Sequence, residues 1–225
     1  MSDAVKTQQV EVLRSASSGT VRYYYALLGF ASLMSITVSL VAVSATRANT
    51  AAVGARRQVS AMSPARQLLT AMAASFTVSF LALLVAFAFM RVVLGVKFGG
   101  REGLAVVALA VCALMATGLG AVLGAIPKMP QSGKLGLATG VTCFCSLFAG
   151  LYGEPAMQLS DHLSQSAPWA LIVNPAAEAA SAFYDLTYYD TLQPFFMTLG
   201  VLAVMALAFL VVAALLMRRQ NYDRL

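Results

Sequence analysis

Five long apolar stretches alternate with more polar gaps along this chain, and nearly all charged residues lie in the gaps. The stretches cover about residues 21–46, 68–90, 103–126, 135–151 and 195–217. In an α-helix, about 20 residues at about 1.5 Å each cross the hydrocarbon core of a bilayer. The pattern therefore predicts an all-α, polytopic membrane protein with five transmembrane helices.

The remaining polar segments predict the rest of the organisation. Residues 1–20 form a polar lead-in, and residues 21–225 form one transmembrane domain. Residues 152–194 are too polar to span a bilayer, but they are rich in aromatic residues and proline, which is typical of the membrane interface and of helix starts. Residues 168–173 and 175–186 are expected to form short interfacial or re-entrant helices.

The amino-acid composition supports a membrane protein and argues against other classes of protein. Of the 225 residues, 60% are apolar and only 11% are charged, which is far from the balance of a soluble domain. The net charge of +6 does not indicate nucleic acid, because the basic residues flank the apolar stretches. The three cysteines lie inside these stretches, where a thiol packs as a small apolar group, and no disulfide or metal site is expected.

The distribution of charge predicts the orientation in the membrane. Alternate gaps and the C-terminal tail together hold nine Lys or Arg and one acid, whereas the opposite gaps and the N-terminal segment hold six Lys or Arg and eight acids. The more basic side is expected to be cytoplasmic. With five spans, the C-terminus is then cytoplasmic and the N-terminus is outside, an arrangement also expected of a chain that lacks an upstream span.

Polar residues recur on one face of the first span, at Ser32, Ser35 and Ser39. This spacing places the three hydroxyls together on a helix. They are candidates for the wall of a translocation path. The alternative is that they bond to carbonyls of their own helix and allow neighbouring helices to pack closely.

The third span carries a pair of glycines, Gly120 and Gly124, four residues apart. Small residues at this spacing allow two helix backbones to approach in a membrane. We expect the two glycines to pack against a helix of the same subunit and not to form a dimer seam.

The first cytoplasmic gap, residues 47–67, is apolar enough for a short interfacial helix that ends before Ser63-Pro64, where a new helix starts. Arg56, Arg57 and Met62 lie on this segment. It is either a docking helix for a cytoplasmic partner or an ordinary basic loop that fixes topology.

Candidate chemistry within the chain itself is sparse. Ser160, Asp161, His162 and Ser164 include the residue types of a hydrolytic triad, but neighbours on one short segment cannot converge as nucleophile, base and orienting acid. No phosphate-binding loop is present, and no span has a central ionisable residue. We therefore expect no catalytic, cofactor or metal site, and any transport must draw its energy from a partner.

Several ordered motifs carry a family resemblance. They are Arg22-Tyr23-Tyr24-Tyr25-Ala26-Leu27, Gly54-Ala55-Arg56-Arg57, Ser63-Pro64, Pro127-Lys128, Asn174-Pro175-Ala176, Phe183-Tyr184-Asp185 and Arg218-Arg219. In this order the chain resembles the ABC-2 type exporter permeases from about residue 21 onward. It differs in having no acid in the first cytoplasmic gap, where many members carry a Glu, and in lacking the family's first span.

The resemblance implies a permease subunit of an ATP-binding-cassette exporter, which moves a substrate across a bacterial cytoplasmic membrane. A separate cytoplasmic ATPase would bind and hydrolyse the ATP, and two permeases, identical or different, would pair. The family's coupling helix corresponds to about residues 51–66, so Arg56, Arg57, Met62 and Ser63 are expected at the ATPase. The rival hypothesis is a membrane scaffold or assembly factor that does not transport, and an intramembrane enzyme is disfavoured.

Overall fold

The computed structural model describes residues 19–222 except 47–63, 97, 99 and 128. This part of the chain contains helices and no β-strand, which confirms the all-α fold class. The helices are α1 (Gly19–Met34), α2 (Ile36–Ser44), α4 (Pro64–Val92), α5 (Glu102–Gly124), α6 (Gln131–Phe148), α7 (Glu154–Ser166), α8 (Pro168–Ile172), α9 (Pro175–Tyr188) and α10 (Gln193–Tyr222). Both short helices expected between residues 152 and 194 are present as α8 and α9.

Four described segments are long and apolar enough to cross a membrane: Val21–Ser44, Arg66–Val92, Glu102–Gly124 and Gln193–Met217. The fifth expected span corresponds to α6, which has 18 residues and is less apolar. At about 1.5 Å per residue, α6 is about 27 Å long, slightly less than the hydrocarbon thickness. The protein is therefore a multi-pass membrane protein, and the fifth crossing stays a prediction.

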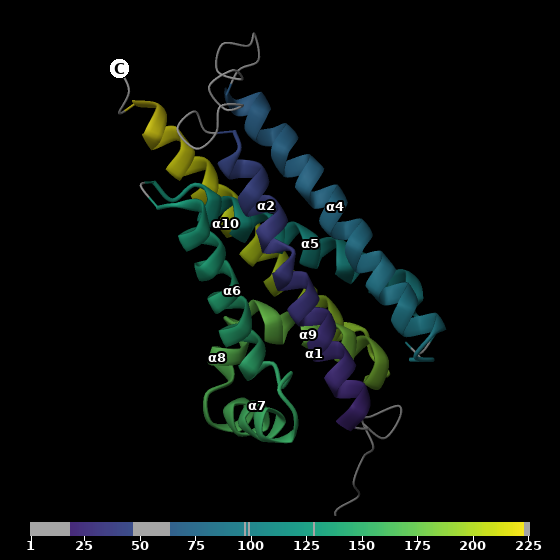
Figure 1. Cartoon of the computed structure of the whole chain (residues 1–225). Coiled ribbons are helices and arrows are strands. Elements are labelled where there is room, and N and C mark those ends of the chain that lie inside the picture. The colour runs from purple at the N-terminus through teal and green to yellow at the C-terminus, as the bar shows by residue number, and fades with distance from the viewer. Residues whose placement is uncertain (1–18, 47–63, 97, 99, 128, 223–225) are drawn as a thin grey trace, which may run out of the picture.

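The long helices run between two ends of one bundle (Figure 1). α1 begins at the lower end of that view, where α7 and α8 also lie, and α10 ends at the upper end. We call the lower end, with α7 and α8, the pocket end. α6 runs from the opposite end towards the pocket end, so its direction agrees with a fifth crossing.

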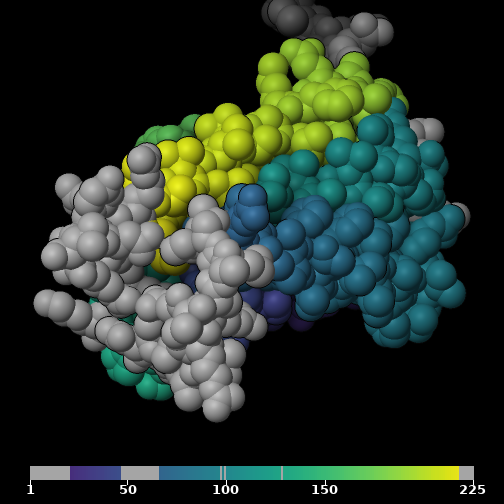
Figure 2. All heavy atoms as spheres, turned by 90° about the horizontal axis from the view of Figure 1, so that it is seen from above, coloured from purple at the N-terminus to yellow at the C-terminus, as the bar shows by residue number. Residues whose placement is uncertain are grey.

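The centre of the bundle is α5, which packs against α2, α4, α9 and α10. Figure 2 shows α4 and α10 at the surface, with the first half of α5 between them. Their outward residues include exposed Leu81, Val85, Val204 and Leu207. Such apolar surfaces fit a lipid environment, in which only the inward face of a helix needs protein contacts.

Glycines form the closest contacts between helices. A Cβ on Gly120 would collide with the carbonyl oxygen of Ile36, and one on Gly124 would lie 3.0 Å from that of Leu40. A Cβ on Gly29 would lie 2.5 Å from the carbonyl oxygen of Ala176. Backbone therefore meets backbone where α5 crosses α2 and where α1 crosses α9, and a larger residue would separate the helices.

Candidate functional site

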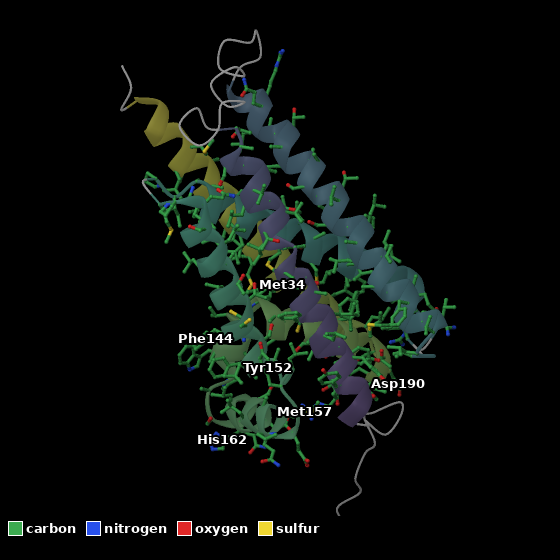
Figure 3. All side chains as sticks on the ribbon, in the orientation of Figure 1. Met34, Phe144, Tyr152, Met157, His162 and Asp190 are labelled. Carbon is green, nitrogen blue, oxygen red and sulfur yellow. The ribbon has the colours of Figure 1, made fainter. Side chains whose placement is uncertain are left out.

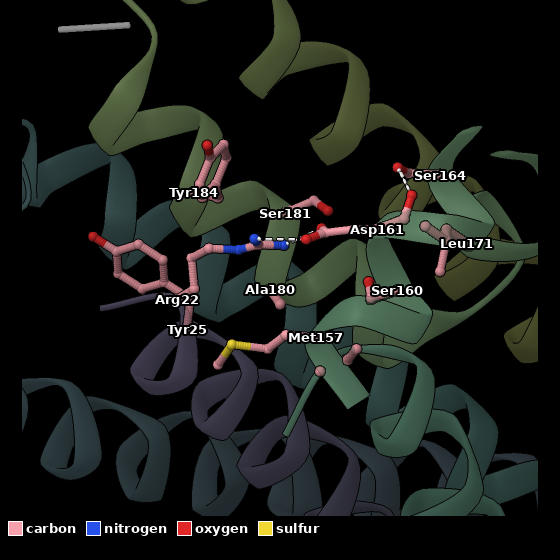
Figure 4. Close-up of a pocket in the computed structure, with 13 residues that line it drawn as sticks. Arg22, Tyr25, Met157, Ser160, Asp161, Ser164, Leu171, Ala180, Ser181 and Tyr184 are labelled. Carbon is pink, nitrogen blue, oxygen red and sulfur yellow. Dashed lines mark hydrogen bonds and ion pairs between the residues drawn. The ribbon is translucent and has the colours of Figure 1, made fainter. Parts of the chain in front are cut away.

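A pocket of about 180 Å³ opens at the pocket end, between α1, α7 and α9. Arg22 and Tyr25 line it from α1, and Ser160 and Asp161 line it from α7. One face of α9 supplies four more lining residues, Ala177, Ala180, Ser181 and Tyr184. Figure 4 shows these side chains around the pocket, with Arg22 and Asp161 facing each other across it.

Arg22 and Asp161 form a two-fold hydrogen-bonded ion pair. One terminal guanidinium nitrogen of Arg22 lies 2.6 Å from Oδ1 of Asp161, and the other lies 3.2 Å from Oδ2. The side chains are 34% and 51% exposed, so water screens the pair and its contribution to stability is about 0–1 kcal/mol. The pair joins α1 to α7 directly, although 139 residues separate them in sequence.

The pocket combines this ion pair with serine hydroxyls and apolar walls. Ser160 and Ser181 lie beside the ion pair, and Met157 and Leu171 contribute hydrocarbon surface. The guanidinium fork of Arg22 is occupied by the Asp161 carboxylate, whereas the serine hydroxyls can donate or accept hydrogen bonds. The arrangement can therefore hold a small polar group attached to an apolar body.

The start of α9 is fixed by Asn174. Its Oδ1 accepts hydrogen bonds from the backbone N–H groups of Ala176 at 3.0 Å and Ala177 at 3.4 Å, which is the usual role of an N-cap asparagine. Its Nδ2 donates to the carbonyl of Cys145 on α6 at 2.8 Å. The cap that the local sequence provides thus also joins α9 to a second helix.

The other end of α9 is held by Arg101, which directly precedes α5. Its guanidinium donates to the carbonyl oxygens of Leu186 at 3.3 Å, Tyr189 at 2.9 Å and Asp190 at 2.7 Å. A cation at a helix C-terminus both satisfies the last carbonyls and interacts favourably with the helix dipole. This contact fixes the last turn of α9 to the start of α5.

α9 also buries two carboxyl groups, Glu178 and Asp185. The hydroxyl of Thr198 on α10 donates to Asp185 at 2.8 Å, whereas Oε2 of Glu178 is buried with no hydrogen-bond partner. Burial, and to a smaller extent the charge of Asp185, raises the pKa of Glu178 to about 7. Burial also raises the pKa of Asp185, and the bond from Thr198 opposes that shift.

The predicted site residues form three groups: the coupling residues, the two glycines of the third span and the three serines of the first span. Arg56, Arg57, Met62 and Ser63 lie outside the described residues. Gly120 and Gly124 lie against α2, within the same subunit.

The three serines of the first span are buried inside the subunit and do not line the pocket. Ser32 and Ser35 donate to carbonyls of their own helix, at 2.8 and 2.6 Å, and Ser39 donates to the carbonyl of Thr117 on α5 at 2.7 Å. The prediction that they form a translocation path is not tested by these contacts.

Sequence reasoning missed the role of α9. It placed residues 152–194 on the outer side and so did not consider Glu178 and Asp185 as buried groups. It named Arg22 only as the first residue of the motif Arg22-Tyr23-Tyr24-Tyr25-Ala26-Leu27. The run of alanines in α9 was a usable signal, because small residues on a helix allow other helices to approach closely.

The residue types of a hydrolytic triad all lie on α7. His162 is exposed and points away from the bundle (Figure 3), and its Nδ1 lies 3.4 Å from the hydroxyl of Ser166. Within the described part of the chain, no group of three His, Cys, Asp or Glu side chains is placed to hold a metal ion. The polar pocket and α9 are therefore the candidate site.

Long apolar helices around a buried helix that carries two carboxyl groups define an integral membrane protein. The chain belongs to the ABC-2 family: the family model described as "ABC-2 family transporter protein" matches residues 2–215. Members of this family are the membrane permease components of ABC transporters, as the resemblance in the sequence indicated. Comparisons with curated proteins and with solved structures give no match.

Proposed function

We propose that this chain is the permease subunit of an ABC exporter that works with a second permease, identical or related, and with separate cytoplasmic ATPases. The observation that carries the proposal is the match to the ABC-2 family over residues 2–215. The bundle of apolar helices supports it. ATP is bound by the ATPase and not by this chain.

The proposed orientation places the pocket end outside a bacterial cytoplasmic membrane. The end of α2, the start of α4 and the end of α10 lie together at the opposite end of the bundle (Figure 1). The gaps and tail at that end belong to the more basic set, which favours a cytoplasmic location. In this orientation α6 is the fifth span and the C-terminus is cytoplasmic.

The proposed coupling element is the segment between α2 and α4. It carries Arg56, Arg57, Met62 and Ser63 and lies on the cytoplasmic side in this orientation. Closure of the ATPases would move this segment and shift the permeases between inward-open and outward-open packings.

At the pocket end, we assign α7 to α9 the role of an outer cover over the substrate path. The Arg22–Asp161 pair holds α7 against α1. Because the pair is exposed and weak, it can open without large loss of stability.

The experiment is affinity purification of the tagged chain from native membranes, followed by identification of bound ATPases and reconstitution of the complex in lipid vesicles. The double variant Arg56→Glu with Arg57→Glu should bind the ATPase less tightly and lose most of the coupled ATP turnover. Arg91→Gln, in the last turn of α4, is the control and should leave turnover near wild type. If no ATPase associates with the wild-type chain, the scaffold hypothesis replaces this proposal.

A further inference from the structure

Glu178 is the least compensated polar group at the candidate site. Its side chain is nine-tenths buried, with 7% exposure, and its Oε2 has no hydrogen-bond partner. An ionised carboxylate in such a position is strongly unfavourable unless a cation or several donors surround it. Since Oε2 is buried within this one subunit, contact with another subunit cannot supply the missing partner.

The helices packed against α9 give Glu178 no counter-charge. Neither α8 nor α10 from Gln193 to Met217 has an ionisable side chain. α1 contributes three tyrosines and Arg22, which is bound to Asp161. On α9 itself, the carboxylate of Asp185 acts on Glu178 with the same sign of charge, and the other ionisable side chains, Tyr184 and Tyr188, are phenols that supply no cation.

The two remaining neighbours, α5 and α6, also leave Glu178 without a cation. α6 carries two cysteines and Lys134, whose Nζ donates to the carbonyl of Gly124 at 2.7 Å, near the end opposite the pocket. α5 carries the buried thiol of Cys112 and, in its first turn, Glu102, which is paired with Arg91. Arg101, before α5, binds the carbonyls at the far end of α9.

We propose that Glu178 is a proton-binding site of this permease: it carries a proton in the packing described here and releases it when α1 or α10 moves away from α9, whose two ends stay held by Asn174 and Arg101. The protonated carboxyl is neutral, so it can remain buried without a cation. On release, the proton passes to water and the carboxylate becomes hydrated. The site itself does not depend on the proposed function, but its use in a transport cycle does.

The pocket provides the path for this proton. Ala177, the residue before Glu178, lines the pocket, and so do Ala180 and Ser181 on the same face of α9. Successive residues of an α-helix are about 100° apart around its axis, so Glu178 lies about 100° from Ala177 and beside the face of α9 that lines the pocket. Movement of α1 or α10 away from α9 would let the water in the pocket reach the carboxyl of Glu178.

The elevated pKa of Glu178, about 7, supports this assignment because both protonation states are then accessible near neutral pH. The sign of the effect on stability follows. In the folded state the group keeps its proton up to about pH 7, whereas in the unfolded chain it loses it near pH 4.5. The folded state therefore binds more protons in this window, and stability falls as the pH rises from about 4.5 to about 7.

The test is an infrared pH titration of the full chain in lipid vesicles, with thermal unfolding measured over the same pH range. We expect a protonated carboxyl band that titrates near neutral pH in wild type and in Glu154→Gln, a control at the start of α7. The band should be absent in Glu178→Gln, in which the loss of thermal stability between about pH 4.5 and pH 7 should also be reduced. An unchanged band and an unchanged stability profile in Glu178→Gln would overturn the proposal.

Asp185→Asn is a second test that keeps Glu178 in place. Removal of the like charge should shift the titration of the band to lower pH, because the ionised form of Glu178 is then less disfavoured. A band that does not shift would contradict the assignment to Glu178, including in the case where Glu178→Gln does not fold.

Failure of this inference can be distinguished from failure of the proposed function. The titration requires no ATPase, so a titrating Glu178 in a chain that binds no ATPase leaves the proton site in place. In an assembled complex, Glu178→Gln should flatten the dependence of ATP turnover on pH near neutrality, and Glu154→Gln should not. Coupled ATP turnover without any neutral-pH titration would overturn the proton site alone.

Discussion

α7 and α9 are separated only by the five-residue α8 and are nearly equal in length, with 13 and 14 residues, but their surroundings differ. Only Ala156 of α7 is buried, whereas most residues of α9 are. α7 is polar and packs against α6 and α8, which adjoin it in the chain. α9 packs against helices from the whole length of the chain.

The difference shows that residues 154–188 supply both a helix that is fixed in the bundle, α9, and a helix that is held loosely, α7. The polar groups at both ends of α9 are bound by protein, through Asn174 and Arg101. α7 follows Gly150 and Gly153, whose φ angles of 82° and 88° are unfavourable for other residues, and an exposed ion pair joins it to α1. We therefore expect α9 to control stability and α7 to control access to the pocket.

The most damaging change to α9 should be Gly29→Ala. The added Cβ would lie 2.5 Å from the carbonyl of Ala176, so the backbones of α1 and α9 must separate. Overpacking of this kind costs about 1–3 kcal/mol or more. Thermal unfolding in detergent measures the loss. Gly200→Ala, where the added Cβ meets nothing within 4 Å, is the control for helix propensity, and equal unfolding temperatures would contradict the close contact.

Loss of the clamp at the end of α9 should have the next largest effect. Arg101→Gln removes charged hydrogen bonds to Leu186, Tyr189 and Asp190, and we expect a loss of about 2 kcal/mol in the free energy of unfolding. Arg101→Lys keeps the charge without the fork and should rescue part of the loss. Arg91→Gln, which breaks only an exposed ion pair, should change stability little. The prediction is wrong if the two glutamine variants are equally stable.

The cap of α9 should contribute less. Asn174→Ala removes both the cap and the bond to Cys145, with an expected loss of about 1 kcal/mol. Asn174→Asp keeps the acceptor for the N–H groups of α9 but cannot donate to Cys145. Hydrogen exchange of the first turn of α9 should increase in the alanine variant and stay low in the aspartate variant. Equal exchange in both variants would show that the cap does not fix this turn.

Loss of the ion pair between Arg22 and Asp161 should have the smallest effect on stability. Its main effect should be to increase the mobility of α7. A double-mutant cycle of Arg22→Gln and Asp161→Asn should give a coupling energy of about 0–1 kcal/mol. Either single variant should increase hydrogen exchange in α7 and leave α9 unchanged. Equal increases in both helices would remove the distinction between a fixed and a movable part.

The short helices α8 and α9, the helix α6 and the serines of the first span show how much the sequence pattern could predict. The helices beginning at Pro168 and Pro175 were predicted because proline favours the first turn of a helix. α6 was predicted as a span, but its lower hydropathy leaves the crossing without confirmation. Periodicity grouped Ser32, Ser35 and Ser39 on one face, but it did not identify their hydrogen-bond partners.

The apolar stretches are long and contain almost no charged residues, and this determined that the protein lies in a membrane. A soluble domain of this size has no core large enough to bury them. The order of the motifs along the chain indicated the family. The packing of distant helices determined the rest. Arg22 meets Asp161, Arg101 meets the end of α9, and Glu178 is enclosed without a counter-charge. The charge state of a carboxyl group depends on the solvent and charges around it, and these come from helices far away in sequence.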